Sequence, residues 1–216
     1  MPYELNAVET RILGCLLEKE RLTPENYPLS LHSLTAACNQ STNRDPVVSY
    51  DEKTVEAGVN SLRDKKLATV VFGAGSRVQK YRHRVLEHYT LNSGETSLLC
   101  VLLLRGPQTA GELRLRTERM SPFEDIPAVE ATLEEMGKGD FPLVRLLPAR
   151  PGQKERRYSQ LFSAESLRKE DEPGSSDSMR DVPPLRTLTF EDELANLKSE
   201  LKQLREEFVA FRKQFD

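Results

Sequence analysis

The chain has 216 residues, of which 38% are hydrophobic and 30% are charged, and its formal net charge is −3. Its longest apolar run, residues 98–104, is far shorter than the roughly 18 residues of a membrane-spanning helix, and the amino terminus lacks a signal peptide's basic start and apolar stretch, so we expect a cytoplasmic protein with no membrane partner. Residues 1–90 contain 12 basic and 11 acidic residues, residues 91–162 contain ten of each, and residues 163–216 contain 9 basic and 13 acidic residues. The excess of acidic residues therefore lies in the tail. The rest of the chain is nearly neutral, which neither supports nor excludes a nucleic-acid partner.

The first 90 residues predict three helices followed by a β-hairpin. Apolar spacing predicts helices over 9–21, 31–40 and from Asp51 to about residue 66, with Ser30 and Asp51 as amino-terminal caps. Residues 67–72 are rich in β-formers, 73–76 contain two glycines typical of a turn, and the alternation over 80–89 predicts the returning strand.

Residues 91–162 repeat this order in a shorter form. Residues 9–17 match 95–103, and 55–57 match 129–131, which indicates a duplication. The predicted helices span 96–104, 109–116 (capped by Thr109) and 127–136, and the predicted strands span 143–147 and 156–162.

Three helices followed by a hairpin is the winged-helix arrangement, a relative of the helix-turn-helix. We therefore predict a mainly α fold with small β-hairpins (α+β), in which two tandem winged-helix domains occupy residues 1–90 and 91–162. Residues 163–186 have the composition of a disordered linker.

Residues 187–216 carry apolar side chains at alternating spacings of four and three, which predicts a coiled-coil helix. The seam includes Leu194, Leu197, Leu201, Leu204, Phe208 and Phe211. We expect these residues to hold a homodimer. The alternative is a helix that docks its apolar stripe on the domains of its own chain.

Several stretches resemble the YceH family of bacterial proteins. They are CLLEK (15–19), TPENYPLS (23–30), ACNQSTNRDPV (37–47), RVQKY (77–81), LLLRGPQTAGELRLRTERM (102–120) and VEATLEEM (129–136). The resemblance covers roughly residues 3–165. It implies an uncharacterised cytoplasmic protein with two tandem winged-helix domains and is consistent with dimerisation, but it implies no reaction and no ligand.

Residues that suit DNA binding occur in the third helix and the hairpin. In winged helices the third helix enters the major groove and the hairpin touches the backbone or minor groove. Lys53 and Asn60 lie on the predicted outer face of that helix, although Glu56 and Asp64 would repel phosphates. The hairpin supplies Arg77, Lys80, Arg82 and Arg84. The alternative is that these basic residues only keep an exposed edge soluble.

The polar stretch at residues 37–46, ACNQSTNRDP, has two interpretations. Its amides and arginine suit hydrogen bonds to bases or phosphates, but a loop must also pair its own backbone groups. We predict a DNA contact for Arg44 and a structural role for part of the remainder, and leave Asn39 and Asn43 open.

The second domain differs in charge. Its third helix carries Glu130, Glu134 and Glu135, and an acidic helix suits a basic protein partner better than phosphate. The main expectation is a DNA-binding or transcription-regulatory protein. The alternative is a non-enzymatic interaction scaffold that does not bind nucleic acid.

We expect neither an enzyme nor a cofactor. The histidines have no metal-ligand spacing with cysteines or carboxylates, and the glycines of the hairpin lack the helix that a phosphate loop needs. Cys15, Cys38 and Cys100 each lie among aliphatic residues and are predicted to be buried small hydrophobes, as in a protein of a reducing compartment.

Overall fold

The computed structural model describes residues 4–72, 78–148 and 155–163, which all belong to one compact unit spanning Met1–Gly174. Arg77, the coiled-coil seam and all of the predicted linker except Ser163 lie outside the described residues. The predictions made for them are therefore neither confirmed nor contradicted.

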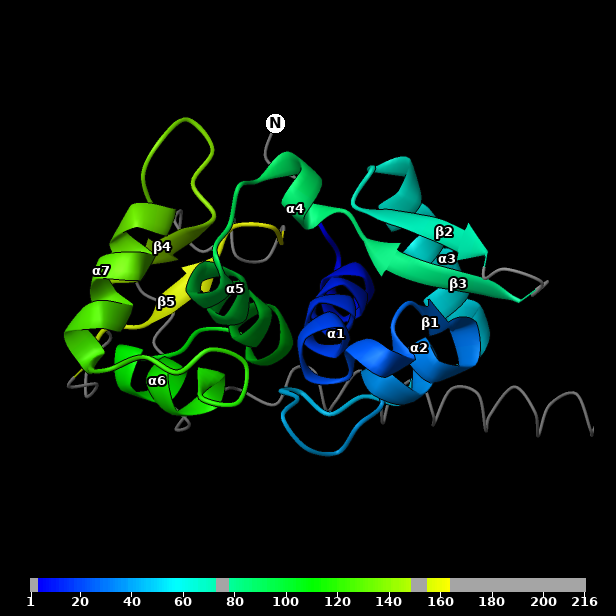
Figure 1. Ribbon diagram of the computed structural model, residues 1–216, viewed down its shortest axis with the longest axis horizontal. Coiled ribbons are helices and arrows are strands. Elements are labelled where there is room, and N and C mark those ends of the chain that lie inside the picture. The colour runs from blue at the N-terminus through cyan, green and yellow to red at the C-terminus, as the bar shows by residue number, and fades with distance from the viewer. Residues whose placement is uncertain (1–3, 73–77, 149–154, 164–216) are drawn as a thin grey trace, which may run out of the picture. The chain divides into compact units, whose positions relative to one another are not determined.

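The elements follow the predicted order twice (Figure 1). The first copy contains α1 (Ala7–Leu22), the 3₁₀ turn η1 (Pro24–Asn26), β1 (Leu29–Ser30), α2 (Leu31–Cys38), α3 (Glu52–Asp64), β2 (Ala68–Phe72), β3 (Gln79–His83) and α4 (Val85–His88). The second contains α5 (Ser93–Arg105), α6 (Ala110–Thr117), α7 (Ile126–Met136), β4 (Val144–Leu146) and β5 (Tyr158–Gln160). The fold is thus a mixed α/β one with small antiparallel sheets.

Side-chain caps start the helices where the sequence predicts them. The side chains of Ser30, Asp51 and Thr109 accept hydrogen bonds from the backbone N–H groups of Ser33, Thr54 and Glu112. These bonds satisfy donors that the first turn of a helix leaves unpaired. The three predicted caps are confirmed.

The returning strand of the first hairpin is shorter than predicted. It ends at His83, and residues 85–88 form the short helix α4 instead of continuing to residue 89. Val85 is fully buried and the N–H of Arg84 donates to the carbonyl of Leu67. Burial of Val85 therefore turns the chain inward where alternation suggested a longer strand.

The sheet of the first copy has the order β1–β3–β2, with all pairs antiparallel. Tyr81 at its centre stands opposite Leu29 on one side and Val70 on the other. In the second copy β4 pairs with β5, and an isolated bridge between Gln108 and Tyr158 takes the place of the third strand. The two copies therefore share a plan that is reduced in the second.

One hydrophobic core joins the two copies. Helices α1 and α5 lie side by side at the centre of Figure 1, and their apolar residues belong to the same buried cluster. Gly14 permits the approach, because a Cβ placed there would lie 2.8 Å from Leu104 Cγ. The predicted boundary at residue 90 falls between α4 and α5 and remains a prediction.

Candidate nucleic-acid interface

The outer face of α3 carries the two residues predicted to contact DNA from this helix. Lys53 is exposed, and Asn60 is half-buried and accepts a hydrogen bond of 2.7 Å from Nη1 of Arg63. The same helix also exposes Glu56 and Asp64. Because these carboxylates repel phosphates, α3 alone has little attraction for DNA.

The β2–β3 hairpin turns basic side chains away from the core. Successive residues of a strand face opposite sides of the sheet, and Tyr81 and His83 are buried, whereas Lys80 and Arg82 are half-buried. Lys80 and Arg82 each stand opposite an uncharged residue of β2. Lys80 and Arg82 thus form the outer face of this hairpin, and we call them the basic strip. Its predicted continuation, Arg77, lies outside the described residues.

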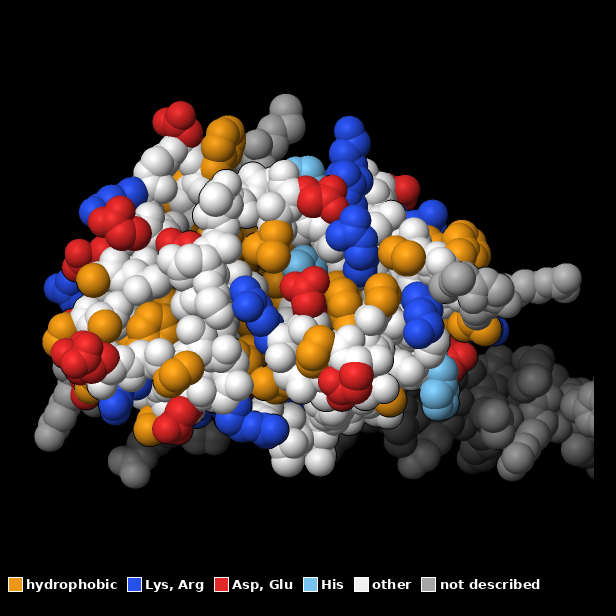
Figure 2. All heavy atoms as spheres, viewed as in Figure 1, with side chains coloured by type: hydrophobic (Ala, Val, Ile, Leu, Met, Phe, Trp, Pro, Cys, Tyr) orange, Lys and Arg blue, Asp and Glu red, His pale blue; other side chains and the backbone are white. Residues whose placement is uncertain are grey.

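One carboxylate, that of Glu87 in α4, binds two of the predicted contact residues. Arg82 Nη2 lies 2.9 Å from Glu87 Oε1, and Arg84 Nη2 lies 2.6 Å from Oε2. The hydrogen bond from Arg84 is the main cause that lowers the pKa of Glu87. Both arginines keep more than a third of their side chains exposed, and Figure 2 shows basic beside acidic side chains where β3 meets α4. The single negative charge of Glu87 therefore neutralises only one of the two positive charges of Arg82 and Arg84.

His83 has a structural role in the same strand. Its ring is buried, with Nε2 2.9 Å from Glu20 Oε2 and Nδ1 accepting a hydrogen bond from the N–H of Val85. Its own N–H donates to the hydroxyl of Tyr27 at 2.8 Å. These contacts fix β3 against α1 and orient the basic strip outward.

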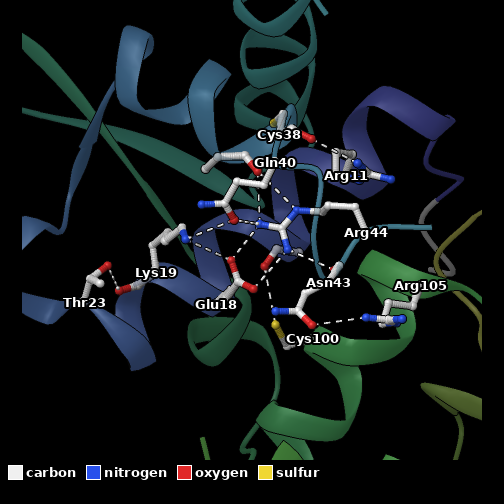
Figure 3. A network of polar contacts seen from close by, with 12 residues as sticks. Arg11, Glu18, Lys19, Thr23, Cys38, Gln40, Asn43, Arg44, Cys100 and Arg105 are labelled. Atoms are coloured by element: carbon white, nitrogen blue, oxygen red, sulfur yellow. Dashed lines mark hydrogen bonds and ion pairs between the residues drawn. The ribbon is translucent and has the colours of Figure 1, made fainter. Parts of the chain in front are cut away.

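The structure does not leave Arg44 on the surface, so its predicted DNA contact is wrong. Its side chain has no solvent exposure. The guanidinium donates to both carboxylate oxygens of Glu18, at 3.0 and 2.7 Å, to the carbonyl of Ala37 and to Oε1 of Gln40 (Figure 3). Without Arg44 the carbonyl of Ala37 would lose this donor, and the buried Glu18 carboxylate would keep only Lys19, at 3.2 Å, as an ion-pair partner.

The rest of the polar loop is also structural. Asn39 exchanges two hydrogen bonds of 2.7 Å with the backbone of Tyr50, in the manner of paired strands. Asn43 adopts a positive φ of 58° and accepts from Arg105 Nη1 at 3.2 Å. The N–H of Asp45 donates to the carbonyl of Leu104 at 3.0 Å. The loop thus ties the first copy to the end of α5, and Asn39 and Asn43 both take part in its hydrogen bonds, although Asn43 remains exposed.

Sequence reasoning missed the charged residues that support this loop. Arg11 is buried in α1 and donates to the carbonyls of Cys38 and Pro46. Glu18 lies seven residues later on the same helix and binds Arg44. The sequence does contain a sign of this role: Arg11 and Glu18 have opposite charges and stand two turns apart among the apolar residues of α1. Charged residues in such positions are rarely buried without partners, so partners elsewhere in the chain could have been expected.

The second copy exposes acidic and apolar side chains together. Glu130, Glu134 and Glu135 of α7 are exposed. Leu115, Ile126 and Phe141 have relative exposures of 69%, 44% and 57%. At the left of Figure 2, over α7, orange and red side chains lie together with some blue ones among them. This surface differs in chemistry from the basic strip of the first copy.

Within the described ranges, no helix is long and apolar enough to cross a membrane. In the same part of the chain, no group of three or more His, Cys, Asp or Glu side chains is placed to hold a metal ion. The three cysteines are buried free thiols, as predicted, and burial raises the pKa of the Cys100 thiol.

Comparison with known proteins identifies the family. A family model described as "Protein of unknown function, DUF480" matches residues 5–153. The chain belongs to this family. Three similar bacterial proteins are each named "UPF0502 protein". That of Geotalea daltonii is 54% identical over 76% of this chain and 75% of its own length. That of Solibacter usitatus is 42% identical over the whole of both chains, and that of Opitutus terrae is 49% identical over 90% and 83%. An uncharacterised bacterial family is therefore confirmed, whereas the name YceH stays a prediction.

Proposed function

We propose that each copy is a winged-helix unit and that the first binds duplex DNA as part of a transcription regulator. The outward basic strip of the first hairpin carries this proposal. The inner face of β3 is anchored by Tyr81 and His83, so Lys80 and Arg82 project together from a rigid strand. Backbone phosphates are the targets of such a strip, and they give affinity without base specificity.

The proposal predicts that the basic strip, together with Arg77 and Arg84 on either side of it in the sequence, supplies most of the DNA affinity. Replacing Arg77, Lys80, Arg82 and Arg84 together with alanine should weaken binding to a labelled duplex, measured by fluorescence anisotropy. Each lost phosphate contact should also reduce the slope of log K against log salt by about 0.9. Glu87→Gln should strengthen binding, because it releases both arginines from their shared carboxylate.

Two exposed basic residues of the second copy provide the control. Arg119→Ala and Lys138→Ala remove a charge each away from the hairpin and should change the affinity little. Equal affinity of the quadruple variant and the parent would show that the hairpin is not the contact. If the parent itself does not bind duplex DNA with a salt-dependent affinity, the DNA proposal is lost.

A second candidate function is protein binding without nucleic acid. It is favoured by the second copy, where α7 exposes three glutamates and where apolar residues of α6, α7 and the segment after α7 are also exposed, a combination that suits a partner with a basic rim and an apolar anchor. A pull-down from native lysate, with and without nuclease, separates the two functions. DNA recovery that nuclease abolishes favours the first, and protein recovery that survives nuclease favours the second.

The homodimer is proposed from the sequence of the carboxyl-terminal segment alone. Leu197→Asp combined with Leu204→Asp places charges in the apolar seam and should lower the mass measured by light scattering. The circular dichroism of the globular part should persist. An unchanged mass would contradict pairing between chains and would favour the alternative, in which the segment docks on the domains of its own chain.

A further inference from the structure

Three arginines of the second copy lie near α6, close enough for the charges of two of them to act on the third. Arg105 ends α5, Arg116 lies in the last turn of α6, and Arg157 precedes β5. Between two of them lies Glu112, with Oε2 2.8 Å from Arg157 Nη1 and Oε1 3.7 Å from Arg116 Nη2. The second distance is too long for a hydrogen bond. We call Arg105, Arg116 and Arg157 the arginine cluster.

The surrounding groups do not balance the charge of the arginine cluster. Among the described residues, Glu112 is the only carboxylate that forms an ion pair with it, and Asp45 attracts Arg116 only from a longer distance. Arg105 donates from Nη1 to the neutral amide oxygen of Asn43. Its Nε is buried and has no hydrogen-bond partner in the described part of the chain. Three positive guanidinium groups are thus opposed by two carboxylates, one in Glu112 and a more distant one in Asp45. The buried Nε of Arg105 is the donor that remains without a partner among the described residues.

The protonation behaviour of Arg116 agrees with this imbalance. Burial lowers the pKa of Arg116, and the positive charge of Arg105 lowers it further, against the opposing effect of Glu112. A guanidinium destabilised by like charges gains from an added anion. Arg116 and Arg157 keep 29% and 33% of their side chains exposed, so solvent reaches the cluster while partial burial strengthens its electrostatics.

We infer that the arginine cluster binds a small oxyanion of the phosphate class, such as a phosphate monoester, with Arg105 and Arg116 as its main donors. The planar fork of a guanidinium matches two oxygens of such an anion. The site touches both copies, because Arg105 also holds Asn43 in the loop that leads to α3. It is independent of the proposed DNA contact, which lies on the first hairpin.

The test is a calorimetric titration of the full chain with inorganic phosphate at constant ionic strength. The parent should bind with a saturable heat. Arg116→Gln should weaken binding at least about tenfold, the loss expected when one charge-assisted hydrogen bond is removed. Arg105→Gln should act in the same direction. Arg119→Gln removes the same charge from an exposed residue next to α6 and should leave the dissociation constant within about twofold of the parent value.

Three results would overturn this inference. The first is a parent that gives no saturable heat, which requires no variant to fold. The second is equal phosphate binding by the parent and a folded Arg116→Gln protein. The third is an equal loss of duplex DNA affinity in Arg116→Gln, which would make the ligand a backbone phosphate. Failure of the hairpin variants to affect DNA binding would leave the phosphate titration unchanged, so the two proposals fail separately.

Discussion

Replacing Arg44 with methionine should lower the free energy of unfolding by about 3–5 kcal/mol, as removal of one partner from a buried ion pair does. The side chain is fully enclosed and holds both oxygens of Glu18, the carbonyl of Ala37 and the amide oxygen of Gln40. Methionine fills the space but leaves the Glu18 carboxylate buried without its main partner. Urea denaturation followed by circular dichroism measures the loss.

Two further variants distinguish the cause. Lys53→Met makes the same kind of change at an exposed position and should shift stability by less than about 0.5 kcal/mol. Glu18→Gln combined with Arg44→Met should cost less than the sum of the single changes, because the double variant leaves no unpaired carboxylate. An Arg44→Met protein as stable as the parent would contradict a supporting role for this ion pair.

The pH dependence of this loss has a defined sign. Burial raises the pKa of Glu18, but the hydrogen bond and charge of Arg44 outweigh burial and lower it below its usual range. A lowered pKa in the folded state contributes stability that is present above the unfolded pKa and is lost as pH falls through the folded pKa. The difference in stability between the parent and Arg44→Met should therefore shrink in acid.

Gly14→Val should destabilise the chain by about 3 kcal/mol through overpacking where α1 meets α5. A Cβ at residue 14 would lie 2.8 Å from Leu104 Cγ and 3.1 Å from Leu103 Cβ. These atoms lie close to the backbone of α5, so rotation of a side-chain end does not clear the contact. The helices must separate, and the core that joins the two copies opens with them. Thermal unfolding measures the effect.

Gly111→Ala is the matched control in a helix of the second copy. A Cβ there meets its nearest atom at 3.8 Å, an ordinary contact, so the helix should gain about 0.5–1 kcal/mol from the loss of glycine flexibility. The two glycine substitutions are thus expected to have opposite signs. Stabilisation of the chain by Gly14→Val would show that the approach of α1 and α5 is not close in solution.

Predictions from sequence succeeded where neighbouring residues carry the information. The apolar spacing that predicts a helix over residues 9–21 and the cap at Asp51 both act within a few residues, and the structure contains α1 and that cap. The strand after residue 80 was predicted too long, because the alternation that ends at His83 is followed by Val85, which belongs to the core. Local patterns do not state where a chain leaves a sheet.

The candidate site was predictable only in part for the same reason. Strand alternation correctly separates Lys80 and Arg82 from the buried Tyr81, since it depends on adjacent residues. The two ion pairs that Arg82 and Arg84 form with the carboxylate of Glu87 were not predicted. They exist because the chain turns from β3 into α4, which the sequence pattern does not indicate.

From the order of its residues alone, this chain could be assigned its two helix-and-hairpin copies, its capped helices and its basic hairpin, because periods of two and 3.6 residues and cap chemistry are local properties. The burial of Arg44 against Glu18, the closeness of Gly14 to Leu104 and the nearness of Arg105 to Arg116 emerged only from the folded chain. Such contacts join residues from separate elements. Whether an arginine is a surface contact or a buried support therefore depends on which carboxylate and carbonyl groups the packing of helices brings to it.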